Sequence, residues 1–118
     1  MTPLLFVIRT SPYQYTLARE AIDALLGTAA LGNPVQVLFS GDGVLHWLPD
    51  QAPTKGQKNL AAMLKALPLY DVDAVYVDRH SLLQRGLDAK LLPAGVQALD
   101  PDALRTLLAQ PGQQLVSF

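Results

Sequence analysis

The chain has 118 residues, of which 50% are hydrophobic and 16% are charged, and its net charge is −1. The high hydrophobic and low charged content exclude an intrinsically disordered chain. The net charge indicates that the chain has no cationic surface for binding nucleic acid or an anionic membrane. Cysteine is absent, which excludes disulfides, thiolate metal sites, iron–sulfur clusters and a cysteine nucleophile. The length suits one hydrophobic core, so we expect a single domain over residues 1–118.

The first apolar run, residues 4–8, predicts a strand that is buried on both faces. It lacks the basic region of a signal peptide, and no stretch approaches the roughly 18 apolar residues of a membrane span. We therefore expect a cytoplasmic protein without membrane contacts. The low share of charged residues predicts that another protein covers part of its surface; the alternative is a monomer with an apolar exterior.

An amphipathic helix is predicted after the break at residues 11–13, with Thr16 as its N-cap. Apolar residues at helical spacing form its buried face: Ala18, Ala21, Ile22, Leu25 and Ala29. The sequence Gly-Asn-Pro at 32–34 ends this helix. Residues 35–40 predict a second strand, and the glycines at 41–43 favour a tight turn.

A short apolar piece, residues 44–48, precedes the second predicted helix. Thr54 and Gln57 fit a capping box at the start of that helix, which ends at Pro68. Its predicted buried face consists of Leu60, Met63, Leu64 and Leu67. Residues 74–77 predict a third strand.

The last third of the chain predicts two further helices and two further strands. Residues 81–84 fit a capping box for a short helix that ends at Gly86. A fourth strand is predicted over 96–99. Asp100 followed by proline is a strong helix start. The predicted apolar face of this helix is Leu104, Leu107 and Leu108. Residues 115–118 predict the last strand.

The alternation of strands and helices predicts an α/β fold. We expect a single-domain, three-layer sandwich with a mainly parallel five-stranded sheet and helices on both faces, as in flavodoxin-like proteins. Functional groups of such folds lie at the carboxyl ends of the strands. Those ends are predicted at residues 9–11, 40–43 and 78–81.

None of these segments carries a motif for cofactor chemistry. The third glycine of a dinucleotide fingerprint that starts at Gly41 would fall at His46, and the chain has no phosphate-binding loop motif. Residues 78–81 contain the residue types of a hydrolase triad, but adjacent residues rarely face one another and no nucleophile elbow is present. We expect no cofactor. His46 and His80, the two histidines, are expected at the surface or at an interface.

Several segments together resemble a known family. The strongest are Arg-Glu-x-x-Asp-Ala-Leu-Leu at 19–26 and Ser-Leu-x-x-Arg-Gly-Leu-Asp at 81–88. Four shorter segments contribute as well: residues 11–13, 39–44, 48–49 and 69–72. In this combination the chain resembles the DsrE/DsrF-like sulfur-relay (TusBCD) family nearly from end to end.

The resemblance implies a subunit of a heterohexamer, a dimer of heterotrimers, with TusB-like and TusD-like chains. Such a complex passes persulfide sulfur through a TusE-like acceptor toward 2-thiouridine at the tRNA wobble position. In the family, a cysteine of the TusD-type subunit carries the sulfur just after the third strand. At that place this chain has Asp78, give or take one or two positions, and a carboxylate cannot form a persulfide. The resemblance therefore implies a non-catalytic subunit. The net charge of −1 leaves no cationic surface for phosphates, so we expect no direct contact with nucleic acid.

Seven positions are predicted to be subunit contacts or remnants of the family's site: Tyr13, Asp42, Asp78, Arg79, His80, Ser81 and Arg85. The alternative is that they are solvated loop residues. A second function remains open, a small-ligand-binding or anion-binding flavodoxin-like module that uses the loops at Ser11, Gly41 and Asp78. A third is an enzyme that uses Asp78 and His80, although these two residues match no recognisable constellation.

Overall fold

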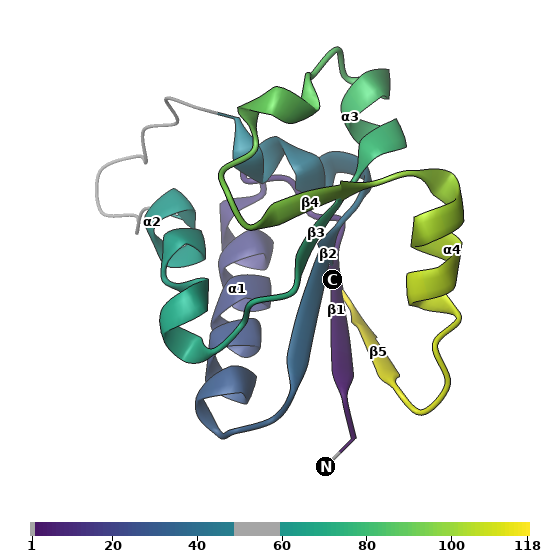
Figure 1. Ribbon diagram of the computed structural model, residues 1–118. Helices are drawn as coiled ribbons and strands as arrows, with labels where there is room; N and C mark the ends of the chain where they lie inside the picture. The colour runs from purple at the N-terminus through teal and green to yellow at the C-terminus, as the bar shows by residue number, and fades with distance from the viewer. Residues whose placement is uncertain (1, 49–59) are drawn as a thin grey trace.

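The computed structural model describes residues 2–48 and 60–118. Its centre is a five-stranded sheet in the order β4-β3-β2-β1-β5, and every pairing is parallel (Figure 1). The strands are β1 (Leu4–Ile8), β2 (Val35–Phe39), β3 (Val75–Asp78), β4 (Val96–Leu99) and β5 (Gln114–Ser117). Each lies within one or two residues of its predicted position, and the predicted fold class is confirmed.

The strand order explains which helix covers which face. From β1 to β4 the chain steps across the sheet in one direction, and right-handed crossovers then place the connecting helices on a single face. That face carries α1 (Tyr15–Ala30) and α2 (Leu60–Lys65). The connection from β4 to β5 reverses direction, so α4 (Pro101–Leu108) lies on the opposite face (Figure 1).

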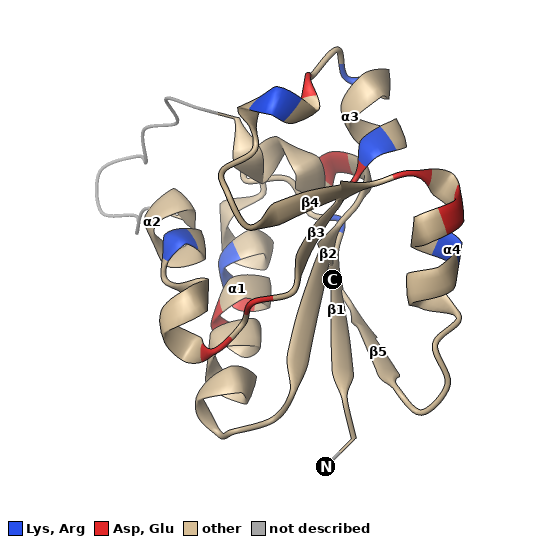
Figure 2. Ribbon diagram, viewed as in Figure 1, with Lys and Arg blue, Asp and Glu red and all other residues tan. Residues whose placement is uncertain are grey.

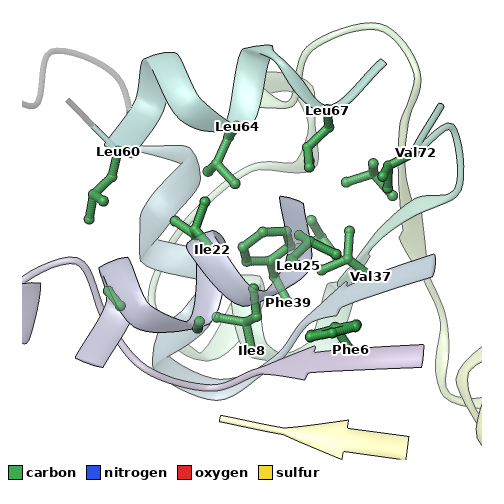
Figure 3. Close-up of a cluster of buried hydrophobic side chains, with 14 of the residues drawn as sticks. Phe6, Ile8, Ile22, Leu25, Val37, Phe39, Leu60, Leu64, Leu67 and Val72 are labelled. Atoms are coloured by element: carbon green, nitrogen blue, oxygen red, sulfur yellow. The ribbon is translucent and has the colours of Figure 1, made fainter. Parts of the chain in front are cut away.

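The larger hydrophobic core lies between the sheet and the two helices α1 and α2. Phe6 and Phe39 point from neighbouring strands toward Ile22 and Leu25 of α1, and Leu64 covers them from α2 (Figure 3). The predicted buried face of the first helix is confirmed, because Ala18, Ala21, Ile22 and Leu25 are all fully buried. Alternate strand residues point to the other face, as the pleat requires.

A smaller core on the second face forms around α4. Leu5 and Leu38 are buried there beneath Leu107, which is 7% exposed. Leu104 packs against this cluster as predicted. The assignment of Leu108 to the buried face was wrong, since its side chain is 40% exposed. It lies one residue beyond Leu107, about 100° around the helix and away from the sheet.

The predicted starts of the first and last helices differ in how well they match the structure. Asp100 is the N-cap of α4 as predicted, and its carboxylate accepts a hydrogen bond from the Ala103 amide at 2.8 Å. The prediction for Thr16 was wrong, because α1 already begins at Tyr15 and its N-cap is Gln14. A turn that Gln14 N–H closes on the Ser11 carbonyl at 3.1 Å leads the chain into the helix earlier than expected.

Short 3₁₀ helices replace several predicted irregular segments. The predicted glycine turn and the apolar piece after it form one 3₁₀ helix, η1 (Gly41–Trp47). The second helix ends at Lys65, and Pro68 belongs to a separate 3₁₀ helix, η2 (Leu67–Tyr70), instead of ending α2. A third, η3 (Ala89–Leu91), precedes β4. The capping box at Thr54 and Gln57 lies outside the described residues.

Candidate functional site

The candidate site lies at the carboxyl edge of the sheet, where β3 passes directly into α3 (Arg79–Gln84). Asp78 is both the last residue of β3 and the N-cap of α3. Its Oδ1 accepts a hydrogen bond from the His80 amide at 3.1 Å. The predicted capping box at Ser81 was therefore wrong, because the strand enters the helix three residues earlier and leaves no loop between them.

Asp78 is the centre of a hydrogen-bonded network that joins two strand ends. Its Oδ2 accepts hydrogen bonds from Ser81 Oγ at 2.9 Å and from Ser40 Oγ at 3.3 Å. Ser81, which is 4% exposed, also accepts a hydrogen bond from the Gly41 amide at 2.9 Å. Oδ2 and Ser81 thus join the end of β2 and the start of η1 to α3, whereas Oδ1 caps α3 itself.

An ion pair between Arg85 and Asp42 connects α3 with η1 on the same edge. Arg85 donates through Nε at 3.2 Å and Nη2 at 2.9 Å to Asp42 Oδ1, and through Nη1 to the Ser81 carbonyl at 3.1 Å. The neighbouring Gly86 ends α3 as predicted, with φ +69° and a hydrogen bond to the Leu83 carbonyl. This left-handed turn brings Leu87 back to the end of α3, where its amide donates to the Leu82 carbonyl at 2.9 Å.

Besides Asp42, three more of the predicted positions are exposed on this edge. Arg79 is exposed, and its Nη2 donates to the Ala98 carbonyl of β4 at 3.4 Å. The His80 side chain is exposed, and Tyr13, in the loop between β1 and α1, is 74% exposed. The structure thus brings Asp42, Asp78, Ser81 and Arg85 into connected contacts and leaves the Tyr13 ring outside them.

His46 was expected at the surface or at an interface, and this expectation was wrong: its side chain is only 3% exposed. Its Nε2 donates to the Thr10 carbonyl at 2.8 Å, and the ring packs against Phe39. Burial lowers the pKa of His46 below its usual 6.5, and the hydrogen bond to Thr10 opposes this shift. The apolar residues on both sides of His46 were the available signal for burial.

The chemistry available at this edge is limited by how the polar groups are used. The amides of Gly41, Gly43 and His80 already donate within the protein. Within the described part of the chain, no group of three or more His, Cys, Asp or Glu residues could hold a metal ion. Acidic and basic residues are interspersed around α3 and η3 (Figure 2), so this edge presents no surface of a single charge.

Comparison with known proteins gives consistent matches along the chain. Residues 3–118 match the model of the DsrE/DsrF-like family. The chain is 43% identical to a TusC homolog from Pseudomonas aeruginosa, with 93% of each chain covered. It is 39% identical to a TusC homolog from Vibrio parahaemolyticus over the full length of both, and 40% identical to TusC from Klebsiella pneumoniae over 92% of each.

Two solved structures share the fold. The ychN protein from E. coli matches with a TM-score of 0.71 at 22% identity, and MTH1491 from Methanobacterium thermoautotrophicum matches with a TM-score of 0.71 at 15% identity. Both alignments cover 100% of each chain. No helix in the two described ranges is both long enough and apolar enough to cross a bilayer. The three relatives named above are TusC proteins or TusC homologs, and the chain belongs to the DsrE/DsrF-like family, as its resemblance predicted.

Proposed function

We propose that this protein is a non-catalytic subunit of a heteromeric sulfur-relay complex that acts in 2-thiouridine modification of the tRNA wobble position. It assembles as one DsrE/DsrF-like domain with TusB-like and TusD-like chains into a cytoplasmic dimer of heterotrimers. The complex delivers sulfur to a TusE-like acceptor, and this subunit contacts the tRNA only indirectly. Membership of the family and the full-length likeness to TusC proteins support the proposal.

The observation that carries the non-catalytic role concerns Asp78. The chain has no cysteine, and the residue at the end of β3 is a carboxylate. Its oxygens accept hydrogen bonds from Ser40, Ser81 and the His80 amide. These bonds give Asp78 the role of joining elements, and a carboxylate offers no sulfur atom for persulfide transfer.

The two other functions are less well supported by the contacts at this edge. An anion-binding module would need free backbone donors, but the amides of Gly41 and Gly43 donate to Ser81 and Ser40. An enzyme that uses Asp78 and His80 would need their side chains to act on one another or on a substrate. Asp78 is bonded within the protein, and His80 contributes its backbone amide to that bonding.

Reconstitution with partner chains tests the proposal. The chain is expressed alone and together with TusB-like and TusD-like chains from the same genome, and each sample is given a radiolabelled persulfide donor. We expect a hexamer by native mass spectrometry, with label on the TusD-like cysteine and none on this chain. Labelling of the pure isolated chain, or a monomer that ignores both partners, would contradict the proposal.

A substitution at Asp78 separates structural from chemical roles. We expect Asp78→Ala to lower the free energy of unfolding by about 2 kcal/mol, since it removes a helix cap and two hydroxyl contacts. The assembled complex should transfer sulfur within about twofold of the wild-type rate, because the thiol belongs to the partner. The control Asp100→Ala removes a cap alone and should cost about 1 kcal/mol. A more than tenfold loss of transfer in assembled Asp78→Ala complexes would show that Asp78 takes part in the chemistry.

A further inference from the structure

The strand β5 leaves one row of its backbone groups unpaired. It is the last strand in the order of the sheet, and within the described residues it pairs only with β1 (Figure 1). The Phe118 amide donates to the Val7 carbonyl of β1 at 2.9 Å. Backbone groups of successive residues point to alternate sides of a strand. The N–H and C=O groups of Leu115 and Ser117 therefore point away from β1, along the outer edge of the sheet.

This edge lacks the features by which proteins keep sheet edges from pairing, which are charged side chains, proline and bulges. The edge strand on the other side of the sheet, β4, has Arg79 beside it, whose Nη2 donates to the Ala98 carbonyl at 3.4 Å. By contrast, residues 106–118 contain no charged side chain. The strand β5 contains no proline, and its register with β1 runs without a bulge. A further strand can therefore be added at β5.

Apolar side chains beside this edge are also exposed. Leu115 is paired in register with Leu5, so it lies on the face of the smaller core, and it is 50% exposed. Leu108 of α4 is exposed as well. Arg9 donates to the Ser117 hydroxyl at 2.6 Å, but strand side chains project above and below the sheet, so this contact does not occupy the outward backbone groups. A strand added here would cover apolar surface as well as backbone groups.

We propose that β5 pairs antiparallel with β5 of a second copy of this chain, across a twofold axis at Val116, so that two sheets join into one. The inference rests on the proposed function and deepens it, because a dimer of heterotrimers contains two copies of this chain. In this register Leu115 lies opposite Ser117 of the second copy, and the outward N–H and C=O groups of both residues gain partners. Val116 lies opposite its own counterpart, which is a favourable pair of β-branched side chains.

The absence of charge favours a second copy over a different chain. Across a twofold axis, a charged residue close to the axis would face a like charge, which destabilises strand pairing. No side chain of residues 106–118 carries a charge, so self-pairing has no such cost. The edge also offers no charge with which to select a TusB-like or TusD-like strand, and charged groups are a common means of choosing a different partner.

The substitution Ser117→Pro tests the hydrogen bonds of this edge. It removes an outward N–H and leaves the bonds to β1 in place, and proline is tolerated on an edge strand in this orientation, so the isolated chain should keep its fold. In the complex with TusB-like and TusD-like chains, the dissociation constant between the two heterotrimers should rise about tenfold or more, because the same hydrogen bond is lost twice. Sedimentation velocity measures this constant.

The matched control is Ser117→Ala, which also loses the hydroxyl contact with Arg9 but keeps the N–H. Its complex should dissociate like wild type. An unchanged dissociation constant for Ser117→Pro would overturn the inference and leave the proposed function intact. A wild-type chain that fails to assemble with the partner chains at all would overturn the proposed function and this inference together.

The absence of cysteine allows a second test, which does not depend on how Ser117→Pro folds. Val116→Cys is a small change, and residues opposite one another at such a position lie about 4.5 Å apart between Cα atoms, within the range of a disulfide. Oxidation of the purified complex with diamide should link two copies of this chain. The control Leu69→Cys, at an 85% exposed position on η2, should not link to its own copy. A Val116→Cys complex that forms no such dimer, or links instead to a TusB-like or TusD-like chain, would overturn the inference.

Discussion

At the scale of single residues, Asp78 shows how a helix start that could activate a thiol is used instead for structure. A cysteine at the N-terminus of a helix is stabilised as a thiolate by the free amides there. Here the Asp78 carboxylate accepts a hydrogen bond from one of those amides and bonds to Ser40 and Ser81 as well. In this chain, Asp78 thus ties the start of α3 to the end of β2 at the edge of the sheet.

His46 is the residue for which the structure predicts a dependence of stability on pH. Burial lowers its pKa in the folded protein, whereas in the unfolded chain it titrates near 6.5. Below that pH the unfolded state binds more protons, so the free energy of unfolding should fall as the pH falls through the folded-state pKa. Between pH 7.5 and 5.0 the loss from this residue is at most about 2 kcal/mol. Urea unfolding at the two pH values measures it.

Two glutamine variants serve as the comparison for this titration. His46→Gln keeps a donor for the Thr10 carbonyl without an ionisable ring, so its loss of stability between pH 7.5 and 5.0 should be smaller than that of wild type. His80→Gln removes the other histidine, whose side chain is exposed, and should keep the loss seen in wild type. If both variants behave alike, burial of His46 is not the cause of the pH dependence.

At the scale of elements, the start of η1 depends on two glycines for different reasons. A Cβ on Gly43 would lie 1.9 Å from the Ile8 carbonyl oxygen of β1, whereas Gly41 has open space but a φ of +56°. We expect Gly43→Ala to destabilise the protein by about 3 kcal/mol, because either η1 or β1 must move. Gly41→Ala should cost only about 1 kcal/mol of backbone strain. Chemical denaturation of both variants measures the difference, and equal costs would contradict this account.

Helix boundaries show where local sequence signals were sufficient. Asp100 with proline after it was correctly predicted as a helix start, since both residues act within one turn. Ser81 and Gln84 had the same kind of signal, yet the cap is Asp78. The difference is tertiary, because pairing of β3 with β2 and β4 holds the strand up to Asp78 and fixes where α3 begins.

At the scale of the whole molecule, the two faces of the sheet are covered unequally. The helices α1 and α2 share one face, and α4 covers the other (Figure 1). We expect Leu107→Ala to cost about 3 kcal/mol, since its side chain closes the smaller core over Leu5 and Leu38. Leu108→Ala should cost less than about 1 kcal/mol, because that side chain is 40% exposed. Thermal unfolding of both variants provides the measurement, and similar costs would mean that α4 packs differently.

The sequence by itself determined the class of fold and the missing chemistry. Apolar runs of strand length alternate with segments whose apolar residues recur at helical spacing, and this alternation predicts a parallel sheet. The pattern can be recognised in the sequence because it depends only on residues near one another in the chain. The residue counts decided that the chain carries no sulfhydryl group. The two segments that most strongly carry the family resemblance could likewise be recognised from the linear order of residues alone.

Only the tertiary structure decided which side chains meet. Asp42 and Arg85 are far apart in the sequence, and so are Ser40 and Asp78, yet each pair forms one contact at the edge of the sheet. The burial of His46 likewise depends on how η1 packs against distant elements. The physical reason is that hydrogen bonds and packing contacts act over a few ångströms in space, and distance along the chain does not specify them.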